Sequence, residues 1–169
     1  MAPALTFADL RAQVLKAPLV FTRVAMSLRP LLVETILGLA ATRPRFATRN
    51  LGGWKSDEAI FDASPSLQAL RTTISLEFLA GRKPIGWAMV NHSGSEHPRH
   101  QHRMATVSGV YYVTAGDPCV PTIFETEAGE VSFDPIPGNL VLFAGEAWHW
   151  VPKYMGTEPR ITIAFDVHR

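Results

Sequence analysis

The spacing of apolar residues divides the chain into two parts. Up to about residue 82, apolar residues recur at the three- and four-residue spacing of amphipathic helices. From about residue 83 they fall in short or alternating runs separated by Gly, Pro, Asp and Asn, as is typical of β-strands. The pattern predicts an α+β chain with a helical part over about 1–82 and a β-barrel or curved sheet over about 83–169.

Three helices are expected in the first part, because each periodic stretch has an N-terminal capping signal. Thr6 followed by Asp9 has the spacing of a capping box. Ser27 is a candidate cap for the middle helix, and Ser64 with Pro65 after it is typical of a helix N-terminus. The expected helices cover about residues 6–16, 28–43 and 65–81, and a short β-rich run at 18–24 separates the first two.

Five short runs in the second part are expected to be strands, at residues 85–91, 106–114, 122–126, 140–143 and 160–167. In the last run the two faces differ in polarity. Ile161, Ile163, Phe165 and Val167 share one face, and Arg160, Thr162, Ala164 and Asp166 share the other. Two interpretations of the polar face are open: it meets solvent, or it lines a polar pocket inside a barrel whose outside the helices cover.

Length and composition indicate one globular domain. The chain has 169 residues, of which 47% are hydrophobic and 18% charged, as expected for a single domain with its own core. The net charge of +1 leaves no global field that would recruit nucleic acid or an anionic membrane. Because Cys119 is the single cysteine, a disulfide framework and a cysteine-based zinc cluster are excluded, and a bound metal would need His or carboxylate ligands.

Neither a secretory signal nor a membrane span is expected. Residues 1–10 contain Asp9 and lack both a basic start and an apolar core. The most apolar run, residues 30–41, carries Glu34 and is far shorter than the ~20 residues that cross a bilayer. We therefore expect a cytoplasmic protein, and the sequence leaves open whether it forms a homodimer.

Candidate chemistry is concentrated in the histidines. His92, His97, His100 and His102 fall within eleven residues, and His100-Gln-His102 directly precedes an expected strand. Alternate residues of an extended segment point to the same side, so His100 and His102 could bind one metal. His149, which follows a later strand, is the candidate third ligand. The simpler interpretation is a His-X-His pair on a solvated loop and a packed, hydrogen-bonded His149.

The segments around these histidines occur in a characteristic order. They are Asn50-Leu-Gly-Gly-Trp-Lys-Ser56, Trp87-Ala-Met-Val-Asn91, His100-Gln-His102, Ser108-Gly-Val-Tyr-Tyr112, Leu140-Val-Leu-Phe143 with His149, and Arg160-Ile-Thr-Ile-Ala-Phe165. In order and spacing they resemble the 2-oxoglutarate and iron(II)-dependent oxygenase family of small bacterial proteins, within the prolyl-hydroxylase-like superfamily. The resemblance covers most of residues 50–167.

The resemblance implies a double-stranded β-helix, or jelly-roll, fold whose barrel mouth binds iron(II) and 2-oxoglutarate. It implies an oxygenase that uses dioxygen to oxidise its substrate, by hydroxylation or another oxidation. Because the chain is short for the superfamily and leaves little room for a lid around a protein substrate, we expect a small-molecule substrate. Three protein ligands would leave three positions on the iron, two for the keto acid and one for dioxygen. The helices of residues 1–82 would then support the barrel of residues 83–169.

Matched residue by residue, the resemblance assigns His100 and His149 as iron ligands and Arg160 as the partner of the distal carboxylate of 2-oxoglutarate. An arginine fork binds a carboxylate through two parallel hydrogen bonds, whereas lysine offers a point charge. The other residues expected to bind 2-oxoglutarate are Thr162, Tyr112 and Asn91, with Tyr111 in place of Tyr112 if a bulge shifts the strand.

His102 is the position where the chain departs from the superfamily, which has Asp or Glu there. The predicted metal site is therefore three neutral imidazoles, His100, His102 and His149, and iron would keep its full formal charge until 2-oxoglutarate binds. His97 is close enough in the sequence to replace His102 as a ligand. Glu96 is the single nearby acid that could restore the usual set.

Two other kinds of function are alternatives. A cupin also combines a His-X-His pair with a later histidine, and the segment from Pro137 to His149 resembles its second motif. Positions 103–107, however, lack the glutamate that a cupin has after its second histidine. A non-catalytic sensing barrel would bind the metal or the keto acid without oxidising anything.

A group of basic residues is the one hint about a substrate. Arg43, Arg45, Arg49 and Lys55 lie around Trp54 in the sequence. Such a group would suit an acidic or zwitterionic molecule, but a solvated charged face has the same composition.

Overall fold

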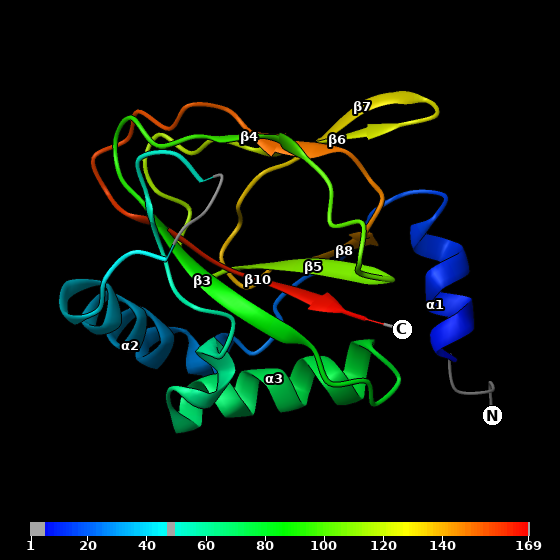
Figure 1. Ribbon diagram of the computed structural model, residues 1–169, viewed down its shortest axis with the longest axis horizontal. Coiled ribbons are helices and arrows are strands. Elements are labelled where there is room, and N and C mark those ends of the chain that lie inside the picture. Colours follow the sequence, from blue (N-terminus) through cyan, green and yellow to red (C-terminus); the bar gives the residue numbers. More distant parts are fainter. Residues whose placement is uncertain (1–5, 47–49, 169) are drawn as a thin grey trace.

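Two antiparallel sheets face each other in the computed structural model, which describes residues 6–46 and 50–168 (Figure 1). The larger sheet has the strand order β1-β8-β5-β10-β3-β2, and the smaller has the order β4-β9-β6-β7. The strands of the larger sheet are β1 Leu19–Phe21, β8 Leu140–Ala144, β5 Val107–Tyr112, β10 Arg160–Val167, β3 Ile85–Asn91 and β2 Trp54–Lys55. Those of the smaller sheet are β4 His97–His100, β9 His149–Val151, β6 Thr122–Thr126 and β7 Gly129–Phe133.

Helices cover the outer face of the larger sheet. α2 (Arg29–Thr42) and α3 (Pro65–Phe78) lie on the side away from the smaller sheet, and α1 (Phe7–Val14) lies near the end of β8 (Figure 1). Short 3₁₀ turns at Met26–Leu28 and Ile60–Asp62 precede α2 and α3. None of the helices within residues 6–46 and 50–168 has the length and apolar character needed to cross a membrane.

Two of the three predicted helix caps are present. The Thr6 hydroxyl accepts from the Asp9 N–H at 3.2 Å, while the Asp9 carboxylate accepts from the Thr6 N–H at 3.0 Å. The Ser64 hydroxyl accepts from the Leu67 N–H at 3.3 Å at the start of α3. Each bond satisfies a backbone donor that the first helical turn would otherwise leave without a partner.

The predicted cap at Ser27 is wrong. Ser27 lies inside the 3₁₀ turn, where the backbone is already helical, and α2 begins at Arg29 without a side-chain cap. The third helix also ends earlier than predicted, at Phe78. The backbone then turns left-handed at Ala80 and Gly81, with φ of +50° and +81°, and a left-handed residue ends a helix.

The main hydrophobic core lies between the larger sheet and the helices. It buries one face of β10 against the inner faces of α2 and α3, and its residues include Ile161, Ile163, Phe165, Val167, Leu32, Ile36, Leu67, Leu70 and Ile74. On the other face of β10, Arg160 and Thr162 line a cavity between the two sheets. Of the two interpretations of this strand, the polar interior with helices outside is therefore confirmed.

All five strands predicted in the second part are present, as β3, β5, β6, β8 and β10, with ends within two residues of the predicted ones. β1 corresponds to the short β-rich run between α1 and α2. The sequence pattern does not predict β2, β4, β7 and β9. Two of these, β4 and β9, carry histidines of the candidate site.

Candidate metal centre

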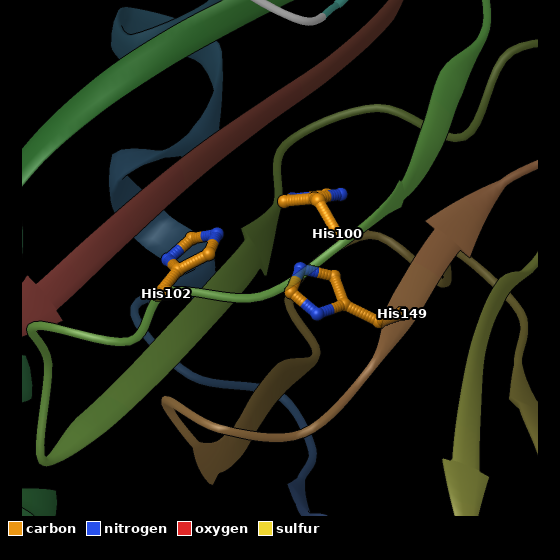
Figure 2. A group of neighbouring side chains, drawn as sticks. All are labelled: His100, His102 and His149. Atoms are coloured by element: carbon orange, nitrogen blue, oxygen red, sulfur yellow. The ribbon is translucent and has the colours of Figure 1, made fainter.

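Three histidines converge between the two sheets. His100 is the last residue of β4 and His149 is the first residue of β9, and the two are direct partners in the ladder between these strands. His102 lies in the loop after β4. Figure 2 shows the three rings turned toward a common space, and one nitrogen of each lies within 4.8 Å of those of the others. The structure thus brings together the three residues that the sequence predicts as ligands.

Hydrogen bonds fix the tautomer of two of these rings. His100 Nδ1 lies 2.8 Å from the Pro98 carbonyl oxygen, and His149 Nδ1 lies 3.0 Å from the Ala147 carbonyl oxygen. A carbonyl oxygen only accepts, so Nδ1 carries the hydrogen in both rings. Nε2 of each ring then carries the lone pair that a metal needs.

The ring of His102 is held by a carboxylate instead. His102 Nδ1 lies 2.6 Å from Asp166 Oδ1, and the Ser108 hydroxyl donates to the same oxygen at 2.6 Å. The side chains of His102 and Asp166 are only 11% and 13% exposed. Because a carboxylate also accepts, Nδ1 of His102 carries the hydrogen and its Nε2 carries the lone pair, as in the other two rings.

Burial keeps His149 neutral. It is 6% exposed, and this burial, with the neighbouring His100, lowers the pKa of His149 to about 2. A metal binds the neutral imidazole, so His149 does not have to lose a proton on metal binding at neutral pH.

His97 packs against the cluster without joining it. Its ring stacks on that of His100, with centroids 4.0 Å apart and planes at 22°, and burial lowers the pKa of His97 to about 2. In the described part of the chain, the group with ligand atoms close enough to share a metal consists of His100, His102 and His149. The geometry therefore favours His102 over His97 as a ligand, and Glu96 is not in the group.

A cavity between the sheets connects the histidines with the polar face of β10. Its walls combine apolar side chains, among them Trp87, Met89 and Phe143, with the polar side chains of Thr122, Arg160 and Thr162. Arg160 is 2% exposed and Thr162 is fully buried. The cavity has a volume of about 30 Å³ and combines mostly apolar walls with a few polar groups at defined places.

Arg160 carries a buried positive charge that no ion pair with a described residue balances. Its Nη2 donates to the Thr122 hydroxyl at 3.3 Å, and its guanidinium lies 5.8 Å from the centre of the Tyr112 ring. Within the described residues, no Asp or Glu forms an ion pair with Arg160, and its Nε has no hydrogen-bond partner. Burial lowers the pKa of Arg160, but a guanidinium stays charged in proteins. A buried charge without a partner is costly, so this end of the cavity favours an anion.

Thr162 lines the cavity with Arg160, and Tyr112 is the direct partner of Thr162 in the ladder between β5 and β10. Thr162 Oγ1 is buried and, among the described residues, has no hydrogen-bond partner. The Tyr112 hydroxyl donates to the Thr122 hydroxyl at 2.8 Å, which places Thr122 between Tyr112 and Arg160. Burial raises the pKa of Tyr112, so the phenol keeps its proton and remains a donor.

Tyr111 and Asn91 have partners elsewhere. Tyr111 lies in the core on the opposite face of β5, where its hydroxyl donates to the Val24 carbonyl at 2.9 Å. Tyr112 is therefore the tyrosine that faces the cavity region. Asn91 exchanges two side-chain hydrogen bonds with Asn50, at 3.0 and 3.3 Å. These bonds tie the segment before β2 to β3, and contact of Asn91 with 2-oxoglutarate stays a prediction.

An open recess of about 460 Å³ lies outside the histidines. His97, His100 and His102 contribute to its wall, together with Lys55 and Trp87. The Lys55 ammonium lies 4.6 Å from the centre of a Trp87 ring. The ring centroids of Trp87 and His102 are 5.6 Å apart. Burial lowers the pKa of Lys55. Beside the histidines the recess thus offers the aromatic surface of Trp87 and charged side chains of both signs, Lys55 and Arg103 with Glu58 and Asp166.

The described basic residues around Trp54 have different surroundings. The Arg45 guanidinium donates to the Asn50 carbonyl, and the Arg43 carbonyl accepts from Trp54 Nε1 at 3.1 Å. Lys55 is the member of the group that reaches the recess. The fourth member, Arg49, lies outside the described residues.

The two segments that carry His102 and His149 are joined through Gly145. The His102 N–H donates to the Gly145 carbonyl at 2.7 Å. A Cβ at Gly145 would lie 2.2 Å from the Ala105 carbonyl oxygen and 2.6 Å from the His102 carbonyl oxygen. Only glycine allows so close a backbone approach.

Sequence reasoning missed the contact partners of His102. The alternation along the last strand puts Asp166 on the same polar face as Arg160, and this parity is the available signal. Ser108 is the direct partner of Asp166 in the pairing of β5 with β10, which the sequence does not reveal. Trp87 and Thr122, which line the cavity, also gave no signal of their own.

Comparisons with known proteins agree with this architecture. Residues 86–134 match the family described as "Putative 2OG-Fe(II) oxygenase", and no curated protein matches the sequence. A prolyl-4-hydroxylase from Pseudomonas putida superposes with a TM-score of 0.67 and 20% identity, over 96% of this chain and 98% of that one.

Two further solved structures contain ligands. The epimerase SnoN of nogalamycin biosynthesis, in complex with Fe3+, alpha ketoglutarate and nogalamycin RO, has a TM-score of 0.74 and 13% identity over 96% of this chain and 83% of that one. HygX from Streptomyces hygroscopicus, with nickel and 2-oxoglutarate bound, has a TM-score of 0.72 and 12% identity over 98% of this chain and 87% of that one.

The shared fold of these proteins confirms the double-stranded β-helix predicted for this chain. The family match runs from β3 to β7 and includes His100, His102 and Tyr112. The partial family match and the shared fold thus relate this chain to 2-oxoglutarate and Fe(II)-dependent oxygenases.

Proposed function

We propose that the protein binds iron(II) through His100, His102 and His149 and 2-oxoglutarate next to it, and that it hydroxylates a small molecule. The observation that carries the proposal is the combination, around one cavity, of three convergent neutral imidazoles and a buried guanidinium with no carboxylate partner among the described residues. A dicarboxylate that also chelates a metal would satisfy both ends of this cavity.

The donor set fits the metal. Three histidine nitrogens with positions left open suit a non-haem iron that must also accept other ligands. The Nδ1 hydrogen bonds of His100 and His149 to backbone carbonyls hold each ring in place before a metal arrives. Both residues are at least nine-tenths buried, so water is kept from most of the ring surface.

Arg160, Thr162 and Tyr112 form the proposed site for the distal carboxylate. Arg160 Nε and Thr162 Oγ1 are buried donors whose hydrogen bonds, among the described residues, are unmade. The Thr122 hydroxyl accepts hydrogen bonds from both Tyr112 and Arg160 and so links these two side chains. A carboxylate there would accept charge-assisted bonds, which are about twice as strong as neutral ones.

Iron(II) and 2-oxoglutarate, when bound, would activate dioxygen for the oxidation of an unactivated C–H bond. The protein's own part is to hold these groups and to exclude bulk water from them. The recess beside Lys55 and Trp87 is the proposed place for the substrate, since it opens next to the histidines. We also propose a cytoplasmic location for the protein. The single cysteine of the chain, Cys119, is an exposed free thiol, which is consistent with a reducing compartment.

The similar proteins leave the reaction open, because their names include a prolyl-4-hydroxylase, an epimerase and a carbocyclase. We favour a small molecule because the recess of about 460 Å³ has the size of a small-molecule pocket. Hydroxylation is the outcome that needs no further protein group.

The proposal is tested by anaerobic titration with iron(II) and 2-oxoglutarate, followed by turnover with dioxygen. We expect a visible charge-transfer band when both are present, and slow formation of succinate even without substrate. A band without succinate would indicate a non-catalytic binding barrel. Metal binding without any band on addition of 2-oxoglutarate would favour the cupin alternative.

A further inference from the structure

The candidate metal centre lacks a negative charge among its ligands. All three imidazoles are neutral when they bind, so the charge of a divalent metal is not offset by the groups that touch it. Asp166 is a carboxylate in direct contact with one of these ligands, since its Oδ1 lies 2.6 Å from His102 Nδ1. His100 and His149 have backbone carbonyls at the equivalent nitrogen. The three ligands are therefore unequal, and one of them is backed by an anion.

The fold holds Asp166 in this position from two sides. It lies near the end of β10 and pairs directly with Ser108 of β5. The Ser108 hydroxyl donates to Asp166 Oδ1 at 2.6 Å, so that oxygen accepts from both Ser108 and His102. Ser108 is fully buried. Hydrogen bonds to a charged group with little water access are stronger than those at the surface.

We propose that Asp166 is a positioning residue that supplies negative charge to the metal centre through its hydrogen bond with His102. The three histidine ligands carry no such charge themselves. The proposal rests on the proposed metal site. Asp166 accepts the Nδ1 hydrogen of His102, which raises the electron density on Nε2 and fixes the direction in which it points. The pair His102–Asp166 thereby acts as one ligand with a net negative charge.

Lys55 offers a competing explanation for the carboxylate. It lies in the same recess as Asp166 and Glu58, and both acids attract its charge. Within the described residues, however, Lys55 forms no ion pair with either acid, and its ammonium lies over the Trp87 ring. The shortest contacts of Asp166 are those with His102 and Ser108. Glu58 is thus a matched control: an acid of the same recess without a hydrogen bond to a histidine.

The first experiment titrates cobalt(II) into the metal-free protein and follows its visible absorption. Asp166→Asn keeps the shape and an acceptor but removes the charge, and we expect cobalt to bind about 10–100-fold more weakly and with shifted bands. Glu58→Gln should change the affinity by less than about fivefold. Ser108→Ala, which leaves the charge but removes one bond that orients it, should lie between the two. Equal affinity and equal spectra for wild type and Asp166→Asn would overturn the proposal.

A double-mutant comparison separates this role from a purely structural one. In His102→Asp the ligand itself carries the charge, so adding Asp166→Asn should leave cobalt affinity unchanged or raise it by relieving repulsion between two acids. If Asp166→Asn lowered the cobalt affinity equally in wild type and in His102→Asp, Asp166 would act by stabilising the fold, and the proposal would be overturned. A His102→Asp variant that folds but binds no cobalt would also overturn it. Wild-type protein that binds no cobalt would instead contradict the proposed metal site itself.

Discussion

The two faces of β10 belong to two different layers of the molecule. On one face, Phe165 and its apolar neighbours are buried against the helices. On the other, Arg160 and Thr162 are equally buried, yet Arg160 Nε and Thr162 Oγ1 lack hydrogen-bond partners among the described residues. The outer layer is therefore apolar, whereas the layer between the sheets holds two buried donors that the described residues leave without hydrogen bonds.

This difference separates stability from function along a single strand. Apolar burial on the outer face stabilises the fold, by about 25 cal/mol for each Å² removed from water. The inner face contributes a buried charge, which costs stability until an anion binds. Substitutions one residue apart on β10 should consequently affect different measurements.

The largest effect is expected on the outer face. Phe165→Ala should lower the free energy of unfolding by about 3–5 kcal/mol, since Phe165 is fully buried and packs near Phe61. Urea unfolding measures this. Leu76, which is 69% exposed on α3, provides the control, because Leu76→Ala should change stability by no more than about 0.5 kcal/mol. A loss below that of a surface variant would contradict the assignment of Phe165 to the core.

On the inner face, the next largest effect should come from the histidines. His149→Ala should weaken metal binding by on the order of 3 kcal/mol, the share of one ligand in a site bound by ~10–16 kcal/mol through four ligands. His97→Ala is the control, since His97 stacks on His100 but lies outside the ligand group. Metal analysis after anaerobic iron loading decides. Retention of metal by His149→Ala, or its loss in His97→Ala, would show that the ligands are misassigned.

Replacement of the buried arginine should affect cosubstrate binding and not stability. Arg160→Met keeps the length of the side chain but removes charge-assisted bonds of about 1.5–3 kcal/mol, so 2-oxoglutarate should bind about ten- to a hundredfold more weakly. Metal affinity should not change, and the unfolding free energy without 2-oxoglutarate should stay level or rise. Calorimetry with Arg71→Ala, which removes a surface arginine paired with Asp62, serves as the control. Unchanged 2-oxoglutarate affinity in Arg160→Met would remove Arg160 from the proposed site.

The last effect concerns pH and grows with the distance from pH 6.5. The pKa values of His97 and His149 are lowered from 6.5 to about 2 in the folded protein, so below pH 6.5 the unfolded chain binds protons that the folded protein does not. Stability of the metal-free protein should therefore be level above pH 6.5 and fall as the pH decreases from there, by up to about 1.4 kcal/mol per pH unit for each histidine. His149→Asn should reduce that slope. An identical slope in wild type and variant would show that His149 is not kept neutral by burial.

Local patterns in the sequence predict the parts of this fold that have local causes. The capping box of Thr6 and Asp9, and the alternation along residues 160–167, both appear in the structure. The unpredicted strands are short and weakly patterned. β4 contains Pro98 and lies at the edge of its sheet, where a proline is tolerated although it weakens the strand pattern. β9 has only three residues and gains its structure from pairing with β4 and β6.

The candidate site could be predicted only as far as spacing and parity reach. The His-X-His pair, the later His149 and the polar face with Arg160 are properties of the sequence, and the structure brings them around one cavity. The hydrogen bond between His102 and Asp166 joins residues far apart in the chain, so it depends on the register of β5 with β10. No local pattern encodes such a register by itself.

The backbone crossing at Gly145 has a consequence for engineering. Because His102 is bonded to Gly145, four residues before His149, the two ligand segments would move together if a side chain were added there. Substitution of Gly145 would thus change the distance between His102 and His149 without replacing either histidine. A mutant library aimed at new substrates should therefore keep Gly145 and vary the residues that line the recess.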